Sequence, residues 1–219
     1  MVDESLSYLL GVIGGDGTIV SSKKQNLVTI TDKCREFHDV LRKLILEAFL
    51  VNSEIKQDKR NKSWYTIIRC KRVSDLLTKE FGYAIGRGKT YTDRIPKQIF
   101  SSSRESILSH IAGWIDSEGS SKIKTFKTKY GTYKYPCITI EVVNKGYLED
   151  LYELSKIIGI QSTKPSVAKR KYRKDQKIRY ALCWNGFEKC KSFLSLIKNP
   201  EKKKMLINKI IRSSDGRPI

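Results

Sequence analysis

The sequence predicts an α+β fold built as a pseudo-two-fold tandem repeat, in which each half has the element order αββαββα. The first observation behind this prediction is a pair of near-copies of one short pattern, Leu9–Gly17 and Ile111–Gly119. Each copy is an apolar helical stretch that runs without a break into an acidic residue followed by glycine. The second observation is that apolar periodicity repeats the same series of helices and strands in both parts of the chain. We therefore expect two related halves, at residues 1–97 and 98–219, joined by a linker at about 90–103.

The first half contains every element of the repeat. Apolar side chains from Phe37 to Ala48 recur at the spacing of a helix, and the basic segment Asp58–Lys62 separates two β-prone runs. The predicted elements are a helix to about Gly15, strands near Thr18–Ser21 and Leu27–Thr31, a helix over Phe37–Ala48, strands near Ser53–Gln57 and Trp64–Arg69, and a helix at about Val73–Phe81.

The second half repeats this order. A capping box formed by Ser102 and Glu105 is expected to open its first helix. A second pair of similar segments, Ile30–Lys33 and Val142–Lys145, places Asp or Asn, both good N-cap residues, before a helix in each half. This pair is offset by 112 residues and the first pair by 102, so the first ribbon of the second half should be longer. The remaining predicted elements are a ribbon over Ser120–Val143, a helix over Tyr147–Ile158, a hairpin over Lys164–Trp184 and a helix over Phe187–Lys198.

The composition indicates a polyanionic partner. Lys and Arg number 43 against 23 Asp and Glu, which gives a formal charge of +20 and a pI near 9.7. A domain this basic has the electrostatic footprint of a nucleic-acid-binding protein. Charge alone does not distinguish DNA from RNA.

The cysteines and the hydropathy favour a reducing, intracellular setting. Five cysteines are an odd number, and none forms a C-x-x-C pair, so neither a disulfide framework nor a structural zinc site is expected. The sequence has no signal peptide, lipidation motif or apolar run of about 18 residues. We expect a protein of the cytoplasm or an organelle that does not insert into a membrane.

The two motif copies resemble the signature of the LAGLIDADG homing endonucleases, in the branch where one chain carries both motifs. At an offset of 102 residues, the acid Asp16 of the first copy corresponds to Glu118 of the second. The identical positions are Leu6, Ser7, Gly11, Ile13 and Gly17, which match Leu108, Ser109, Gly113, Ile115 and Gly119. The second motif position, usually small, is Leu10, and the sixth, commonly Asp, is Gly14 in the first copy and Asp116 in the second.

The resemblance implies two antiparallel sheets that form a DNA-binding saddle, with the motif helices paired at the interface between the halves. Gly11 and Gly113 lack a Cβ, so helices that meet at them can approach closely. Gly17 and Gly119 suit the left-handed residue that often ends a helix. The ends of the two motif helices would then lie side by side near the pseudo-two-fold axis.

The resemblance also implies Mg²⁺-dependent hydrolysis of phosphodiesters in double-stranded DNA by a monomer that needs no protein partner. Asp16 and Glu118 would act as the catalytic acids and hold the metal, together with the backbone carbonyls of Gly15 and Ser117. Mn²⁺ or Ca²⁺ would substitute for Mg²⁺ in binding.

A basic residue is implied near each scissile phosphate, after the last helix of each half. The candidate for one active site is Lys89. The candidates for the other are Lys198, Lys202 and Lys203.

DNA recognition would come from the antiparallel ribbons, lying in the major groove. Most of their basic residues would contact phosphates and a few would contact bases. Trp and Tyr residues near strand ends are expected in the core. The predicted DNA-binding residues are Lys23, Lys24, Gln25, Lys56, Lys59, Arg60, Arg69, Lys122, Lys124, Lys127, Lys129, Lys134, Lys169, Arg170, Lys171, Arg173, Lys174 and Arg179.

Three functions remain open at this point. The first is a homing endonuclease that cuts a long asymmetric or pseudo-symmetric site, since the ribbons of the two halves differ. The second is an RNA maturase of the same fold that assists intron splicing, which has no need of two intact acids. The third is a catalytically inactive DNA-binding regulator, which would have lost an acid. Intein splicing residues are not seen at either end, so a free-standing, intron-encoded protein is expected.

Overall fold

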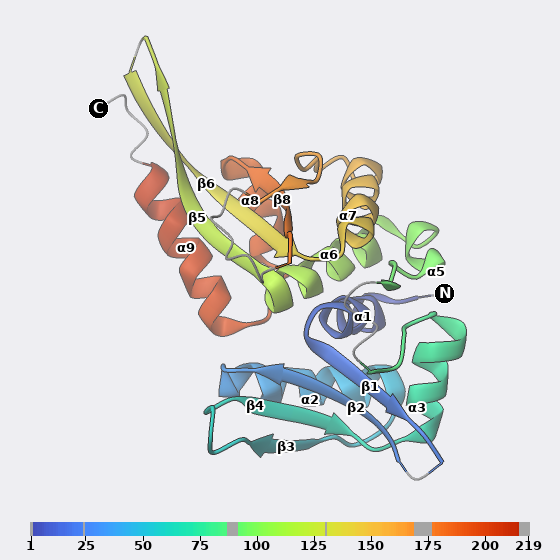
Figure 1. The fold of residues 1–219 in the computed structure, drawn as a ribbon. Coiled ribbons are helices and arrows are strands. Elements are labelled where there is room, and N and C mark those ends of the chain that lie inside the picture. Colours follow the sequence, from blue (N-terminus) through green and yellow to red (C-terminus); the bar gives the residue numbers. More distant parts are fainter. Residues whose placement is uncertain (1, 24, 87–91, 130, 169–176, 215–219) are drawn as a thin grey trace.

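A computed structural model describes residues 2–23, 25–86, 92–129, 131–168 and 177–214 (Figure 1). The first half contains α1 (Glu4–Asp16), β1 (Gly17–Ser21), β2 (Asn26–Asp32), α2 (Arg35–Phe49), β3 (Glu54–Gln57), β4 (Trp64–Ile68), α3 (Lys71–Asp75) and the π-helix η1 (Leu76–Glu80). A short helix, α5 (Lys97–Phe100), lies in the predicted linker. The second half contains α6 (Arg104–Glu118), β5 (Gly119–Thr128), β6 (Gly131–Val142), α7 (Lys145–Ile157), β7 (Ser166–Val167), β8 (Tyr180–Asn185), α8 (Phe187–Leu194) and α9 (Pro200–Ser214).

Each half forms an antiparallel four-stranded sheet. The strand order is β1-β2-β4-β3 in the first sheet and β5-β6-β8-β7 in the second, which is the same arrangement twice. Figure 1 shows one sheet on either side of the paired helices α1 and α6. The predicted α+β fold and the duplicated order αββαββα are therefore confirmed.

The first ribbon of the second half is much longer than its counterpart. Strands β5 and β6 have 10 and 12 residues, whereas β1 and β2 have 5 and 7. The ends of β5 and β6 project beyond the body of the protein as an arm (Figure 1). The prediction from the changed offset is confirmed.

One face of the second sheet is buried under helices. Ile138, Ile140, Leu182 and Trp184 on this face have at most 1% of their surface exposed. The Trp184 ring meets the Phe193 ring of α8 edge-on at 5.2 Å. Since side chains alternate along a strand, the residues between them lie on the opposite face, which we call the open face. The apolar side chains of both halves form one continuous core that includes α1 and α6.

Helix α9 was not predicted. Its start is marked by Asn199 before Pro200: the Asn199 carboxamide accepts hydrogen bonds from the N–H groups of Glu201 (3.2 Å) and Lys202 (3.4 Å), and proline suits the first turn. The run of lysines that follows obscures this signal. The preceding helix ends at Leu194, earlier than the predicted Lys198.

Two smaller predictions were wrong, whereas the helix predicted at about Val73–Phe81 is found as α3 followed directly by η1. The N-cap of α6 is Ser103, whose hydroxyl accepts from the Ser106 N–H, so the predicted capping box with Ser102 is one residue out of register. Asn144 is the N-cap of α7, as expected. The equivalent Asp32 is not the N-cap of α2, which is Cys34; the Asp32 carboxylate accepts a hydrogen bond from the Cys34 N–H (2.6 Å).

Two expectations from the composition can be compared with the structure. All five cysteines are free thiols in the structure. Within the described ranges, no helix combines the length and the apolar character needed to span a bilayer.

Candidate active site

The motif helices α1 and α6 touch backbone to backbone. A Cβ on Gly11 would lie 2.2 Å from the His110 carbonyl oxygen, and a Cβ on Gly113 would lie 2.2 Å from the Tyr8 carbonyl oxygen. Real side chains cannot approach so closely, so both positions require glycine. The predicted interface glycines therefore sit at reciprocal positions of one close helix crossing.

Buried polar contacts fix this crossing. The Ser7 hydroxyl donates to the Ser106 carbonyl at 2.6 Å, and His110 Nδ1 lies 3.1 Å from the Ser7 carbonyl. Burial lowers the pKa of His110 to about 4, so the ring is neutral at neutral pH and donates from Nδ1. These hydrogen bonds thus prevent α1 and α6 from sliding past each other.

The two catalytic candidates end the two helices. Asp16 is the last residue of α1 and Glu118 is the last residue of α6, and both are half-buried. A Cβ on Gly15 would lie 2.0 Å from Ser117 Oγ and 3.2 Å from Glu118 Cγ, so the helix ends are in contact. The structure therefore brings together all four predicted metal-ligand residues, Asp16, Glu118, Gly15 and Ser117.

The glycines after the acids have a different role from the predicted one. Gly17 (φ −80°) and Gly119 (φ −73°) are extended, not left-handed. Their N–H groups donate to the carbonyls of Ile13 and Ile115, and a Cβ would lie 2.6 Å and 2.4 Å from those oxygens. Glycine is needed because each chain turns directly from helix into strand across its own last helical turn.

Gly14 also makes room for neighbouring side chains. A Cβ at this position would lie 2.6 Å from the Tyr147 hydroxyl and 2.9 Å from the Trp114 indole. The glycine that replaces the usual acid in the first motif is therefore required by packing. Beside it lies a small cavity of about 100 Å³, lined in part by Glu118, Glu141 and Arg179.

Asp116, the acid of the second motif's sixth position, is a buried anchor for the chain before α9. Its Oδ2 accepts hydrogen bonds from the Tyr8 hydroxyl and from the N–H groups of Lys198 (2.6 Å) and Asn199 (3.1 Å). Burial raises the pKa of Asp116 to about 6, and burial with the Asp116 carboxylate nearby keeps the pKa of Tyr8 well above its usual value. This carboxylate thus connects α1, α6 and the start of α9.

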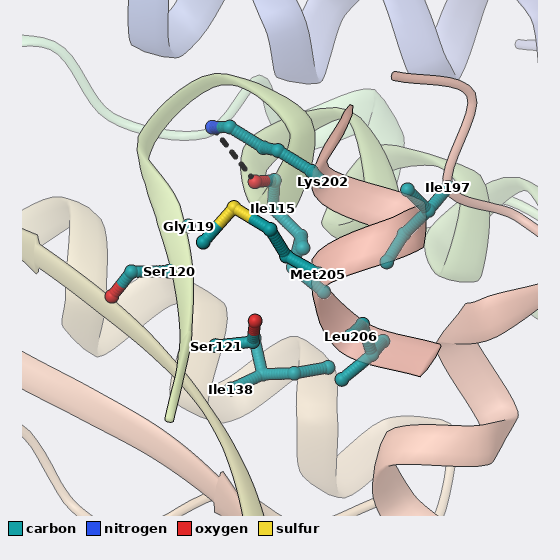
Figure 2. Close-up of a pocket in the computed structure, with 9 residues that line it drawn as sticks. All are labelled: Ile115, Gly119, Ser120, Ser121, Ile138, Ile197, Lys202, Met205 and Leu206. Carbon is teal, nitrogen blue, oxygen red and sulfur yellow. Dashed lines mark hydrogen bonds between the residues drawn. The ribbon is translucent and has the colours of Figure 1, made fainter. Parts of the chain in front are cut away.

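Lys202 contacts the end of the second motif helix. Its Nζ donates to the backbone carbonyls of Ser117 and of Ile115 (3.3 Å). Figure 2 shows the side chain extending from α9 towards the Ile115 carbonyl, over a cavity of about 180 Å³. Burial lowers the pKa of Lys202, and the carboxylates of Asp16, Asp116, Asp32 and Glu118 oppose this effect. Of the predicted lysines that the structure describes, Lys202 is therefore the one whose ammonium contacts the end of α6.

The other predicted lysines lie elsewhere. The Lys198 ammonium lies 5.4 Å from the centre of the Tyr8 ring, and only its backbone N–H contacts Asp116. Lys203 follows Lys202 on α9 and donates its backbone N–H to the Asn199 carbonyl (2.9 Å). Lys89 lies outside the described residues.

The donor set at the motif ends suits a hard divalent cation. Carboxylates and backbone carbonyls are the protein ligands that Mg²⁺ and Ca²⁺ prefer. Among the described residues, no cluster of three or more His, Cys, Asp and Glu side chains is found, so DNA phosphates and water would complete the coordination. The Ser117 carbonyl, one of the expected ligands, accepts a hydrogen bond from the Lys202 ammonium.

The predicted DNA-binding residues of the first half fall into two groups. Lys23 and Gln25 are exposed at the β1–β2 turn, and Lys59 is exposed at the β3–β4 turn. Other predicted residues have acidic partners: Glu54 pairs with Lys56 (2.7 Å) and Arg69 (3.1 Å), and Asp58 with Arg60 (3.5 Å). Lys24 lies outside the described residues.

In the second half, strand register separates the lysines into two faces. Lys122 is opposite Cys137 and Lys124 is opposite Tyr135, which places both on the open face. Lys127 and Lys134 lie at alternate positions and therefore on the other face of the ribbon. Lys129 follows β5, and Arg179 precedes β8. Lys169, Arg170, Lys171, Arg173 and Lys174 lie outside the described residues.

Comparisons with known proteins agree with this architecture. Residues 3–81 match the family model described as a LAGLIDADG-like domain. The chain is 24% identical over 162 residues to the uncharacterized protein MJ0314 of Methanocaldococcus jannaschii; the match covers 72% of this chain and 56% of that protein. The chain thus spans about half the length of this curated relative.

Solved structures match over almost the whole chain. The homing endonuclease I-DmoI in complex with DNA and Ca has a TM-score of 0.62 at 18% identity, over 94% of this chain and 98% of that chain. The meganuclease I-SmaMI bound to uncleavable DNA has a TM-score of 0.58 at 14% identity, over 94% of this chain and 89% of that chain. Identities this low establish a shared fold.

Proposed function

We propose that the protein is a site-specific endonuclease for double-stranded DNA, because residues 3–81 match the model of a LAGLIDADG-like domain and the whole chain has the fold of the two-domain homing endonucleases. The proposal includes dependence on a divalent cation, Mg²⁺ in the first place. The structurally similar I-DmoI has been crystallised with DNA and Ca or Mn, and a variant of it with DNA in the presence of Mg. Intron encoding and an asymmetric target remain part of the proposal.

The observation that carries the proposal is the pair of acids at adjoining helix ends. Asp16 and Glu118 are both retained, both half-buried and both at the point where a motif helix becomes a strand. An inactive regulator or an RNA maturase has no need of this matched pair. The pair therefore favours a nuclease with one acid for each DNA strand.

Each side chain at the motif ends has a role that follows from its position. A bound divalent cation would polarise the scissile phosphate and lower the pKa of a coordinated water. Asp16 and Glu118 would hold that cation, with carbonyl oxygens of Gly15 and Ser117. The Lys202 ammonium would stabilise negative charge on the phosphate and move a proton at the leaving oxygen. Asp116 would position Lys202 by anchoring the start of α9.

The most direct test starts from a randomised DNA library. Cleavage selection with Mg²⁺ should recover one long site without strict two-fold symmetry. Supercoiled plasmid that carries this site is then cut with wild-type protein, Asp16→Asn and Glu118→Gln, and DNA binding is measured in parallel. Each variant should bind normally and lose linearisation, because a charged ligand is removed while shape is kept.

A matched control separates loss of the metal site from loss of charge. Glu105→Gln changes an exposed acid in the first turn of the same helix as Glu118 and should cleave like wild type. Recovery of no cleaved DNA by the wild-type protein would contradict the proposal. Linearisation at the wild-type rate by Asp16→Asn or Glu118→Gln would remove that residue from the active site.

A further inference from the structure

Two aromatic side chains are exposed on the β5–β6 arm. Phe126 has 58% of its surface exposed and Tyr133 has 38%. The two residues are directly opposite each other in the antiparallel register, so their side chains form a cross-strand pair on one face. The expectation that tyrosines near strand ends belong to the core is wrong for Tyr133.

This pair lies on the same face of the ribbon as Lys122 and Lys124. Alternation along β5 places Phe126 on the face of Lys122 and Lys124, which is the open face of the sheet. The opposite face carries Ser121 and Ile138, which line the cavity beneath α9. The arm therefore presents cationic groups and an apolar patch together, away from the core.

The partner that this combination fits is the major groove of DNA. Lys122 and Lys124 have the charge to contact phosphates along the groove wall. Within the groove, the 5-methyl group of thymine is the apolar feature of the base edges, and phenyl rings contact it. An exposed aromatic pair next to these cations, further along the same face of the ribbon, would meet such methyl groups.

We propose that Phe126 and Tyr133 determine sequence specificity by contacting thymine methyl groups in the second half of the target, an inference that rests on the proposed function. The position of the contact follows from the length of the ribbon. Phe126 is seven residues along β5 from Gly119, beside the motif ends. At about 3.4 Å per strand residue this is roughly 24 Å. At about 3.4 Å per base pair, the contact lies about seven base pairs from the centre of the target.

The first experiment is a binding selection without metal, so that cleavage plays no part. Wild-type protein, Phe126→Ala and Tyr133→Ala are each equilibrated with a randomised duplex library, and the bound DNA is sequenced. Wild type should enrich thymine, on either strand, at about six to eight base pairs from the centre on one side only. The two variants should lose this preference and keep the others.

The second experiment removes only the methyl group. Thymines at the enriched positions are replaced by uracil in the selected duplex, and affinity is measured by fluorescence anisotropy. Wild type should bind the uracil duplex roughly three- to four-fold more weakly per methyl removed. Phe126→Ala should bind the thymine and uracil duplexes equally.

Ile157→Ala is the matched control. Ile157 is equally exposed (57%) but lies at the end of α7, so this variant should behave as wild type in both experiments. Circular dichroism and the melting temperature of each variant show that it is folded. Loss of one cross-strand aromatic pair costs about 0.2–1 kcal/mol, so each truncation should lower the melting temperature by only a few degrees.

Two failures can be told apart. The inference would be overturned if the wild-type protein bound duplex DNA in a salt-sensitive way but showed no thymine preference, or bound thymine and uracil duplexes with equal affinity. The nuclease proposal would then remain intact. A thymine preference that depends on Phe126, in a protein that cuts no DNA with Mg²⁺, would overturn the nuclease proposal and support this one.

Discussion

The ammonium group of Lys202, on α9, donates a hydrogen bond to the backbone carbonyl of Ser117, one residue before the acid that ends α6. This contact connects an additional helix of the second half to the candidate active site. Asp116 and the N–H groups of Lys198 and Asn199 determine where α9 begins, and this places Lys202 within reach of the motif ends. The position of one side chain thus depends on three separate segments.

Replacing Lys202 by Met should lower cleavage about 10²- to 10⁴-fold, the range for loss of a group that transfers a proton in the transition state. Binding to the target should change little, because one phosphate contact among many is lost. The measurement is single-turnover cleavage of the selected site with Mg²⁺. Lys203→Met, one residue further along the same helix, is the matched control and should cut normally. Equal loss of cleavage in both variants would contradict the assignment of Lys202.

Gly11→Ala and Gly113→Ala should each destabilise the protein strongly. The added methyl group would lie 2.2 Å from a backbone oxygen of the other motif helix, and backbone cannot move aside as a side chain can. Overpacking typically costs about 1–3 kcal/mol, and these sites should lie at or above the upper end. The check is the free energy of unfolding in urea. Gly146→Ala, whose Cβ would meet only side-chain atoms, of Arg94 at 3.3 Å and Asn144 at 3.4 Å, should cost far less.

Asp116 should make stability fall as pH rises from about 4 to about 6. Burial raises its pKa in the folded protein to about 6, from 3.8, so between these values the folded state keeps a proton that the unfolded state has lost. The free energy of unfolding then decreases with rising pH, by up to roughly 3 kcal/mol in total. The measurement is the difference in unfolding free energy between wild type and Asp116→Asn in EDTA from pH 3.5 to 7.

Asp116→Ala is the contrasting variant for this prediction. Asparagine keeps an oxygen for the Tyr8 hydroxyl and the two N–H donors, whereas alanine leaves all three without an acceptor. Each buried donor left unpaired costs about 1–3 kcal/mol. Alanine should therefore be much less stable than asparagine at every pH. A wild-type-minus-asparagine difference that does not vary with pH would show that Asp116 is not protonated in the folded state near pH 5.

DNA binding should weaken steeply with salt. If six to ten phosphates are neutralised, affinity should fall about 10³- to 10⁵-fold between 50 and 200 mM salt. Lys122→Ala should reduce the slope of the logarithmic plot by about 1. Lys56→Ala should have a smaller effect, because Glu54 already pairs with Lys56 at 2.7 Å. An affinity that hardly changes over this range of salt would show that the positive charge of the protein does not contribute to DNA binding.

Local sequence signals predicted most of the elements but few of the contacts between them. The motif repeats identified both helix ends, at Asp16 and Glu118, because an apolar helical stretch followed by an acid and a glycine can be recognised from nine consecutive residues. The same local view misassigned Gly17 and Gly119. Their extended backbone and close approach to Ile13 and Ile115 depend on the strand that follows, which helix-capping rules do not include.

The sequence by itself determined the duplication, the order αββαββα, the charge and the two matched acids, since each of these is a property of neighbouring residues or of composition. Only the tertiary structure selected Lys202 from three nearby lysines, because the choice depends on how Asp116, 82 residues away from Lys198, anchors the start of α9. Likewise, only strand register separated Lys122 and Lys124 from Lys127 and Lys134, and placed Phe126 beside Tyr133. Contacts between distant segments depend on the packing of the whole core, so patterns of neighbouring residues in the sequence do not predict them.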